Sequence, residues 1–286
     1  MLALQLLING LVTGSALGVV AVAFSLVFST AKIFHVAHAG VYTMAGYLAW
    51  SLVSRGVPSP LALVIVVGLC ALTGALIEHQ LYDRLKQRRA TDLVILIASI
   101  GLLSVMQNIL AAAYSPNILQ FPLPWASEIV VLGGIRLTSS QILTVLFSLL
   151  AYAAILGFAT RTILGKRIRA VASNPFLAEI TRLEPRRVYV YVIAIASALV
   201  ALPGVMVPLD FGLQPYGGIT SLLTATIAMI AGGVGSLNGA YLIAVAIAVM
   251  QNLCLLVIPG EWSIGVTFFI FVIFMLFRPT GLFTQR

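Results

Sequence analysis

Eight apolar runs follow one another along the chain, and most of them are long enough to cross a lipid bilayer. The hydrocarbon core of a bilayer is about 30 Å thick, and about 20 helical residues cross it. Only 8% of the residues are charged, against roughly 25% in soluble domains. The runs show no alternation of apolar and polar residues, so they predict helices rather than barrel strands. They occupy residues 5–28, 35–54, 60–79, 92–114, 139–160, 188–209, 220–258 and 262–278.

We therefore expect an all-α fold, a polytopic transmembrane helical bundle with about eight spans and one or two broken or re-entrant helices. The run at 220–258 is too long for one span, and the glycine-rich stretch 231–239 divides it. The stretch 29–40 is a second candidate break, either a cytoplasmic turn or unwound backbone within the membrane. The chain is expected to form a single transmembrane domain, residues 1–286, with a cytoplasmic loop at 161–187.

Basic residues predict the orientation of the chain, because short loops rich in Lys and Arg stay in the cytoplasm. Such residues gather in the loop near 84–89, in the loop 161–187 and at the C-terminus. The intervening loops hold few charges, so we assign them to the outside and the C-terminus to the cytoplasm. The first residues lack the basic segment of a cleavable signal peptide, which indicates a retained first span.

The sequence contains few of the motifs that indicate an enzyme active site. Its histidines are His35, His38 and His79, and no GxSxG or HExxH motif accompanies them. We expect no metal site and no catalytic residue. No GxxxxGK[ST] loop is present, so the chain cannot hold ATP by itself. Deep ionisable residues, which ion-coupled transporters use, are nearly missing from the spans, so any energy for transport has to come from another polypeptide.

The segment 165–180 combines basic residues with a helical pattern. Asn174 can cap a second helix whose first residue is Pro175, so the loop predicts two short helices joined at Ser173–Asn174. A basic loop lying on anionic lipid is one interpretation. A helix that seats in a groove of a partner protein is the other. The candidate coupling residues are Gly165, Lys166, Arg167, Ile168, Arg169, Ala170, Val171, Ala172, Asn174 and Pro175.

Polar and glycine residues at the two candidate breaks could line a substrate path, because unwound helices near the middle of the membrane often build transporter sites. A plain tight turn at 232–239, and histidines that are merely packed, are the alternatives. The path candidates are Asn9, His35, His38, Gly40, Gly232, Gly233, Gly235, Ser236 and Asn238.

Gly10, Gly14 and Gly18 recur every four residues and form a stripe on one face of the first span. Such a stripe lets two helices approach closely. It favours packing within the subunit and a dimer face about equally.

Four segments in order resemble the permease subunit of ATP-binding cassette (ABC) importers for branched-chain amino acids, the LivH-like family. They are residues 6–50, "GKRIRAVASNPFLAEI" (165–180), "IAGGVGSLNGAYLIAVAIAVMQNL" (230–253) and "RPTGLF" (278–283). The resemblance covers essentially the whole chain. It implies a bacterial inner-membrane importer in which 165–180 couples to an ATPase.

The resemblance also implies partners. They are a second permease subunit, paralogous or identical, two cytoplasmic ATPases that bind ATP, and an extracytoplasmic solute-binding protein. No cofactor is expected on the chain itself. The resemblance implies branched-chain or other apolar amino acids as the solute, and a path with few fixed charges suits a neutral or zwitterionic one. Urea, amides, small aromatic acids and a stand-alone channel remain as alternatives.

Overall fold

The computed structural model describes residues 1–278 and 281–283. Of the closing segment 278–283, positions 279 and 280 lie outside the described residues, as do residues 284–286. Most of the described chain is helical, as the apolar runs predict. The helices are α1 (Leu2–Ala31), α2 (His38–Ser54), α3 (Ser59–Ile77), α4 (Asp83–Gln87), α5 (Asp92–Tyr114), α6 (Ser139–Arg161), α7 (Ile163–Ser173), α8 (Pro175–Ile180), α9 (Pro185–Phe211), α10 (Gly218–Gly232), α11 (Leu237–Cys254) and α12 (Ser263–Phe277).

Seven helical segments of the described chain are long and apolar enough to span a membrane. One of them runs from Ser59 to Gln87, because the π-helical turn η1 (Glu78–Tyr82) joins α3 to α4 without a break. The predicted runs at 92–114, 139–160 and 188–209 match α5, α6 and α9 within a few residues. Helices α2 and α10 are shorter, with 17 and 15 residues.

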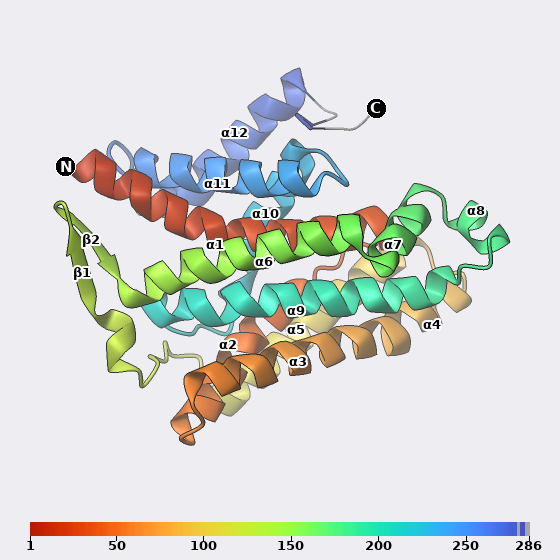
Figure 1. Ribbon diagram of the computed structural model, residues 1–286, viewed down its shortest axis with the longest axis horizontal. Helices are drawn as coiled ribbons and strands as arrows, with labels where there is room; N and C mark the ends of the chain where they lie inside the picture. Colours follow the sequence, from red (N-terminus) through yellow and green to blue (C-terminus); the bar gives the residue numbers. More distant parts are fainter. Residues whose placement is uncertain (279–280, 284–286) are drawn as a thin grey trace.

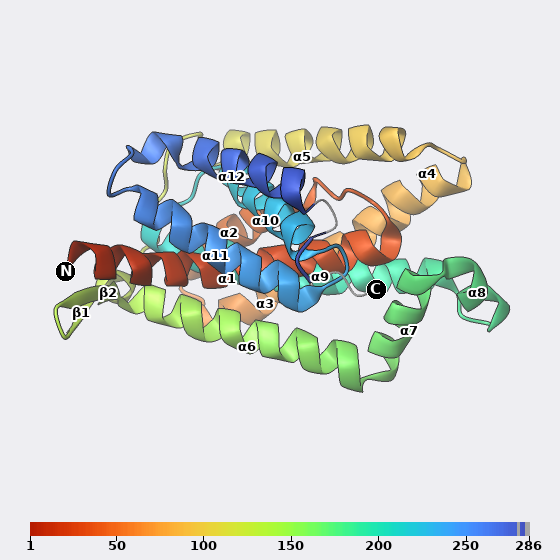
Figure 2. The ribbon, with the colours of Figure 1, turned by 90° about the horizontal axis from the view of Figure 1, so that it is seen from above.

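The long helices lie roughly side by side along the long axis of the molecule (Figures 1 and 2). α4, α7 and α8 lie at one end, called here the α7–α8 end. The N-terminus and a small hairpin lie at the other, called here the hairpin end. The basic loops that the sequence assigns to one side of the membrane thus meet at one end of the bundle.

The hairpin is the one departure from the all-helical expectation among the described elements. Strands β1 (Ile129–Leu132) and β2 (Ile135–Thr138) pair antiparallel. Gly133 and Gly134 join them with φ angles of 58° and 87°, the positive values that a tight type I′ turn requires. The strands are short and lie between two spans, where the analysis of apolar runs has no signal for them.

Helix α1 lies at the centre of the bundle and packs against α6, α9, α10 and α11. In its most apolar window 78% of the residues are buried, against 6% in the window that ends at Phe277. Hydropathy alone ranks the two segments similarly, so the sequence does not distinguish the central helix from a peripheral one.

Both predicted breaks are present. α1 ends at Ala31, and the next residue, Lys32, adopts a left-handed conformation with φ 56°. The linker 32–37 then runs inside the protein, with Ile33, His35 and Ala37 buried. The Ala37 N–H donates a hydrogen bond of 2.9 Å to the Ser99 hydroxyl in α5. Since one helical residue rises about 1.5 Å, this contact lies about 10 Å inside the first residue of α5. The linker is therefore unwound backbone that protein covers, the arrangement tolerated within membranes.

Candidate functional site

The segment 165–180 forms two short helices at the α7–α8 end, divided as the sequence predicts. The Asn174 side chain accepts a hydrogen bond of 3.1 Å from the Leu177 N–H, and Pro175 begins α8. Gly165, Ile168 and Val171 are buried, whereas Lys166, Arg167 and Ala170 are exposed. Ala172 is half-buried, and Arg169, Asn174 and Pro175 are exposed. The candidate coupling residues are thus divided between an inner and an outer face.

Helix α8 presents an apolar surface to its surroundings. Phe176, Leu177 and Ile180 are 69%, 56% and 65% exposed. α8 projects beyond the ends of the long helices (Figures 1 and 2), so these side chains lie away from the apolar body of the bundle. Exposed apolar side chains next to basic ones are typical of a protein-docking surface.

The corner between α6 and α7 fixes the position of this surface. The Thr162 hydroxyl caps α7 by accepting a bond of 2.9 Å from the Gly165 N–H. A Cβ atom on Gly165 would lie 2.4 Å from the Phe158 carbonyl oxygen, so only glycine fits there. The Arg169 guanidinium donates to the Ala159 carbonyl oxygen. Arg169 therefore braces α7 against α6 and is less available to a partner than Lys166 or Arg167.

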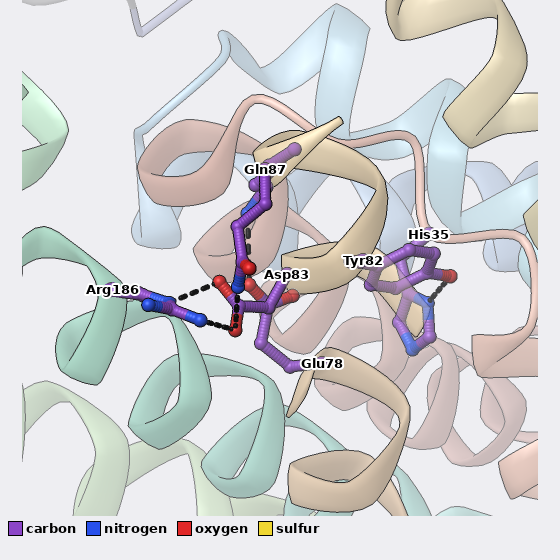
Figure 3. Close-up of polar contacts among 7 residues, drawn as sticks. His35, Glu78, Tyr82, Asp83, Gln87 and Arg186 are labelled. Carbon is purple, nitrogen blue, oxygen red and sulfur yellow. Dashed lines mark hydrogen bonds and ion pairs between the residues drawn. The ribbon is translucent and has the colours of Figure 1, made fainter. Parts of the chain in front are cut away.

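Two groups of polar contacts lie near this end, one at Asp83 and one at Tyr82, and the backbone joins them because these two residues are neighbours in the chain (Figure 3). Arg186, at the start of α9, forms an ion pair with Asp83 of α4, and Gln87 donates a bond of 3.1 Å to the same carboxylate. The neighbouring residue Tyr82 closes the π-helical turn η1. π-helical turns occur frequently at functional sites. The turn thus joins the surface ion pair to a buried side chain.

Tyr82 connects α3 with the linker and α5. Its hydroxyl lies 2.7 Å from His35 Nδ1 and donates a bond of 2.8 Å to the Ser99 hydroxyl, which also holds the Ala37 N–H. His35 and His38 are fully buried, with ring centroids 5.4 Å apart. Among the described residues, neither nitrogen of His38 has a hydrogen-bond partner, and no three potential metal ligands gather.

A cavity lies in the half of the bundle at the hairpin end. It has a volume of about 530 Å³, within the range of about 300–1,000 Å³ usual for small-molecule sites. Residues of α1, α2, α6, α9, α10, α11 and α12 contribute to its wall. Its polar lining consists of Thr13, Tyr42, Thr144, Asp210, Thr220, Ser221, Thr224, Gln251 and Asn252.

None of the nine path candidates lines this cavity. Asn9 lies one helical turn before the lining, and its backbone carbonyl accepts a bond from Thr13. His35 and His38 lie at the linker, towards the other end. Gly40 packs against Met106 of α5, where a Cβ atom would lie 2.8 Å from the Met106 sulfur.

The glycine-rich stretch 232–239 forms the tight turn between α10 and α11. Gly233 and Gly235 have φ angles of 102° and 90°, and a Cβ on Gly232 would lie 2.4 Å from the Gly239 carbonyl. Ser236 caps α11 through the Gly239 N–H, and the Asn238 side chain accepts a bond of 2.9 Å from the Tyr152 hydroxyl. The Phe283 N–H donates to the Gly232 carbonyl oxygen. In this structure these residues hold backbone segments together.

The glycine stripe of α1 lies against α11 of the same chain. A Cβ on Gly10 would lie 2.6 Å from the Val249 Cα, and one on Gly14 would lie 2.8 Å from the Val245 Cα. On Gly18 it would lie 2.5 Å from the Tyr241 ring. The structure therefore places this stripe in an intrasubunit contact.

Sequence reasoning missed the cavity because its wall comes from helices far apart in the chain. One signal was available. Three polar residues lie in or near the ends of apolar runs, close to the ends that the predicted topology puts outside the membrane. They are Asp210, Gln251 and Asn252. Asp210 directly follows the apolar run 188–209, so the predicted topology puts it in an outside loop, whereas it lies in the last turn of α9 and lines the cavity.

Comparison with known proteins is consistent with this architecture. Residues 6–275 match the family described as the permease component of branched-chain amino acid transport systems. The high-affinity branched-chain amino acid transport system permease protein BraD of Pseudomonas aeruginosa is 24% identical over 291 residues, covering 98% of this chain and 95% of the relative. The corresponding LivH proteins of Salmonella typhimurium and Escherichia coli K12 are each 24% identical over 293 residues, covering 98% of this chain and 94% of the relative.

A solved structure shares the fold. It is described as PsaBC from Streptococcus pneumoniae in complex with Fab, and it aligns with a TM-score of 0.53 at 14% identity. The alignment covers 93% of this chain and 90% of that chain. Because the family match extends over nearly the whole sequence, the chain belongs to the family of permease components of branched-chain amino acid transport systems.

Proposed function

We propose that the chain is the membrane-spanning permease subunit of an ABC importer that moves branched-chain or other apolar amino acids across the bacterial inner membrane. The family assignment supports this function, and so do the names of the relatives. The chain itself would move the solute and would catalyse no chemical reaction. ATP would bind to separate ATPase subunits, and the permease would need no cofactor of its own.

The exposed surface of α7 and α8 is the observation that carries this proposal. It combines Lys166 and Arg167 with the apolar side chains of Phe176, Leu177 and Ile180. A permease that draws energy from a separate ATPase needs such a surface outside the lipid. A stand-alone channel has no use for it.

The distribution of charge supports a cytoplasmic position for the α7–α8 end. Basic residues concentrate there, in and directly after α4 and around α7 and α8, whereas the hairpin from β1 to β2 holds one basic residue, Arg136. Lys- and Arg-rich short loops remain in the cytoplasm. The hairpin and the N-terminus would then face the outside, where a solute-binding protein would dock. Helix α12 runs back from the hairpin end, which favours a cytoplasmic C-terminus.

The importer would contain two permease subunits, this chain with a paralogue or with a second copy, and two ATPases. ATP-driven movement of the ATPases would push α7 and α8. The Arg186–Asp83 ion pair and η1 offer a route by which this push reaches the linker 32–37, because each member contacts the next.

The test is the replacement Phe176→Asp. A few anchor side chains of a docking surface each contribute about 2 kcal/mol or more. Phe176 is the most exposed apolar side chain of α8, so an aspartate there should remove most of the ATPase from the purified complex. Co-purification of tagged permease with its ATPase measures the loss. Val131→Asp is the matched control, because Val131 is 61% exposed at the hairpin end. Normal ATPase recovery with Phe176→Asp would contradict the proposed docking surface.

A further inference from the structure

The wall of the cavity at the hairpin end carries one charge. Asp210 is the sole ionisable acid or base, Tyr42 aside, among the described residues that line it. The other polar groups are hydroxyls and amides, and the remainder is apolar. Asp210 also forms no ion pair with any described residue. A carboxylate on a cavity wall that has no cationic partner favours a solute with a positively charged group, because that group neutralises the charge.

Hydrogen bonds hold this carboxylate in place. Asp210 Oδ1 accepts bonds from the Thr138 hydroxyl, at 2.8 Å, and from the Ser140 hydroxyl. Thr138 is itself fixed, because it and Gln141 form a capping box at the start of α6. No described residue donates a hydrogen bond to Oδ2. The group is therefore positioned through one oxygen and has the other available.

The neutral polar groups of the wall are mostly acceptors. Thr13, Thr144, Thr220 and Thr224 each donate their hydroxyl proton to a backbone carbonyl of the preceding helical turn. The Asn252 amide nitrogen donates to Thr13 and to the Ala248 carbonyl oxygen. Oxygen lone pairs remain, and they suit a solute that donates N–H groups.

Two hydroxyl groups of the wall can donate hydrogen bonds to an acceptor group of the solute. The hydroxyl-bearing residues Tyr42 and Ser221 line the same cavity. They offer O–H donors for a solute carboxylate. Aliphatic side chains, among them Val12, Leu17, Val20, Val207 and Leu255, complete the wall and suit an apolar solute side chain.

We propose that this cavity holds the amino acid in transit and that Asp210 binds its ammonium group. The pathway would then select zwitterionic amino acids against carboxylic acids of the same shape. The inference rests on the proposed import function and narrows the solute class, because small aromatic acids are anions and urea carries no cationic group. A fixed carboxylate repels the first and gains less from the second.

Binding to the permease–ATPase complex in lipid nanodiscs, without the solute-binding protein, tests the selectivity of the permease itself. The wild-type complex should bind leucine and 3-methylbutylamine, which keep the ammonium group. Its affinity for 4-methylpentanoate, which lacks that group, should be lower by a factor of about ten or more. This comparison needs no variant. Equal binding of leucine and 4-methylpentanoate would overturn the proposal.

Asp210→Asn then assigns the selectivity to one residue. Asparagine keeps an Oδ1 acceptor for Thr138 and Ser140 but loses the charge, so leucine binding should fall about tenfold or more. Asp210→Glu should restore the preference for the ammonium group. Glu261→Gln is the matched control, because it removes an exposed acidic charge near the same end that does not line the cavity. Leucine binding by Asp210→Asn equal to that of wild type would also overturn the proposal.

Uptake by the complete importer separates this inference from the function on which it rests. ATP-driven leucine uptake by the wild-type importer in vesicles supports the import function. Wild-type uptake together with unselective binding refutes only the role of Asp210. Lack of uptake of any amino acid by the wild-type importer refutes the import function itself.

Discussion

At the scale of single residues, hydrogen bonds between buried polar groups join three separate segments of the chain in the half of the bundle towards the α7–α8 end. Tyr82 meets His35 and Ser99 at 2.7 and 2.8 Å, and Ser99 holds the Ala37 N–H. These groups come from α3–η1, the linker and α5. Since each is buried, the loss of one partner leaves another polar group without a hydrogen bond.

Tyr82→Phe should therefore destabilise the protein by about 1–3 kcal/mol, because His35 and Ser99 lose a shared partner in a buried site. Thermal unfolding of the purified protein in detergent measures this change. Tyr191→Phe is the matched control, since Tyr191 is 49% exposed on α9 and should lose little stability. Equal melting temperatures for Tyr82→Phe and wild type would show that the linker is held by packing alone.

At the scale of elements, the close contact between α1 and α11 determines how the core is built. Gly10, Gly14 and Gly18 let α11 approach α1 to backbone contact. Close approach of this kind is a principal source of helix association in membranes, where lipid and side chains are equally apolar.

Gly14→Ala should destabilise the protein by about 1–3 kcal/mol, because the added methyl group meets the Val245 backbone and neither helix can yield locally. Gly68→Ala on α3 is the matched control, since no atom lies within 4 Å of a Cβ there. The melting temperatures of the two variants provide the measurement. A tolerated Gly14→Ala would indicate that α1 and α11 can separate without cost.

At the scale of the whole molecule, the structure joins the proposed docking end to the interior through the Arg186–Asp83 ion pair and η1. The cavity lies in the opposite half of the bundle. Import requires these two regions to change together, so the connecting contacts should affect coupling more than assembly.

Asp83→Asn should leave the ATPase bound but lower the amount of leucine imported per ATP hydrolysed several-fold, because α4 and α9 lose their ionic contact. Uptake and ATP hydrolysis measured in the same vesicles give this ratio. Glu184→Gln is the control. Glu184 is the N-cap residue of α9 and pairs with Arg187 in the first turn of the same helix, so this exposed ion pair links α9 to no other described element. An unchanged ratio for Asp83→Asn would remove the ion pair from the coupling route.

The sequence by itself determined most of the long helices, their order, the two breaks and the cap at Asn174, but its third apolar run ends at residue 79, whereas the helical segment continues to Gln87. These features depend on local hydropathy, on glycines that permit unusual φ angles, and on residues within one turn of a helix end. It also identified the segment 165–180 as a separate pair of short helices. Each of these signals lies within a short window of the chain.

Only the tertiary structure decided which helix is central, which partner the glycine stripe of α1 contacts, and where the cavity lies. In a membrane, lipid and protein interior are both apolar, so a helix that faces lipid has nearly the same composition as one that is buried. The cavity and the Tyr82 contacts join residues separated by tens to hundreds of positions. Asp210 illustrates the difference, because in the sequence it is one acid at the end of an apolar run, and only the fold places it on the wall of a cavity.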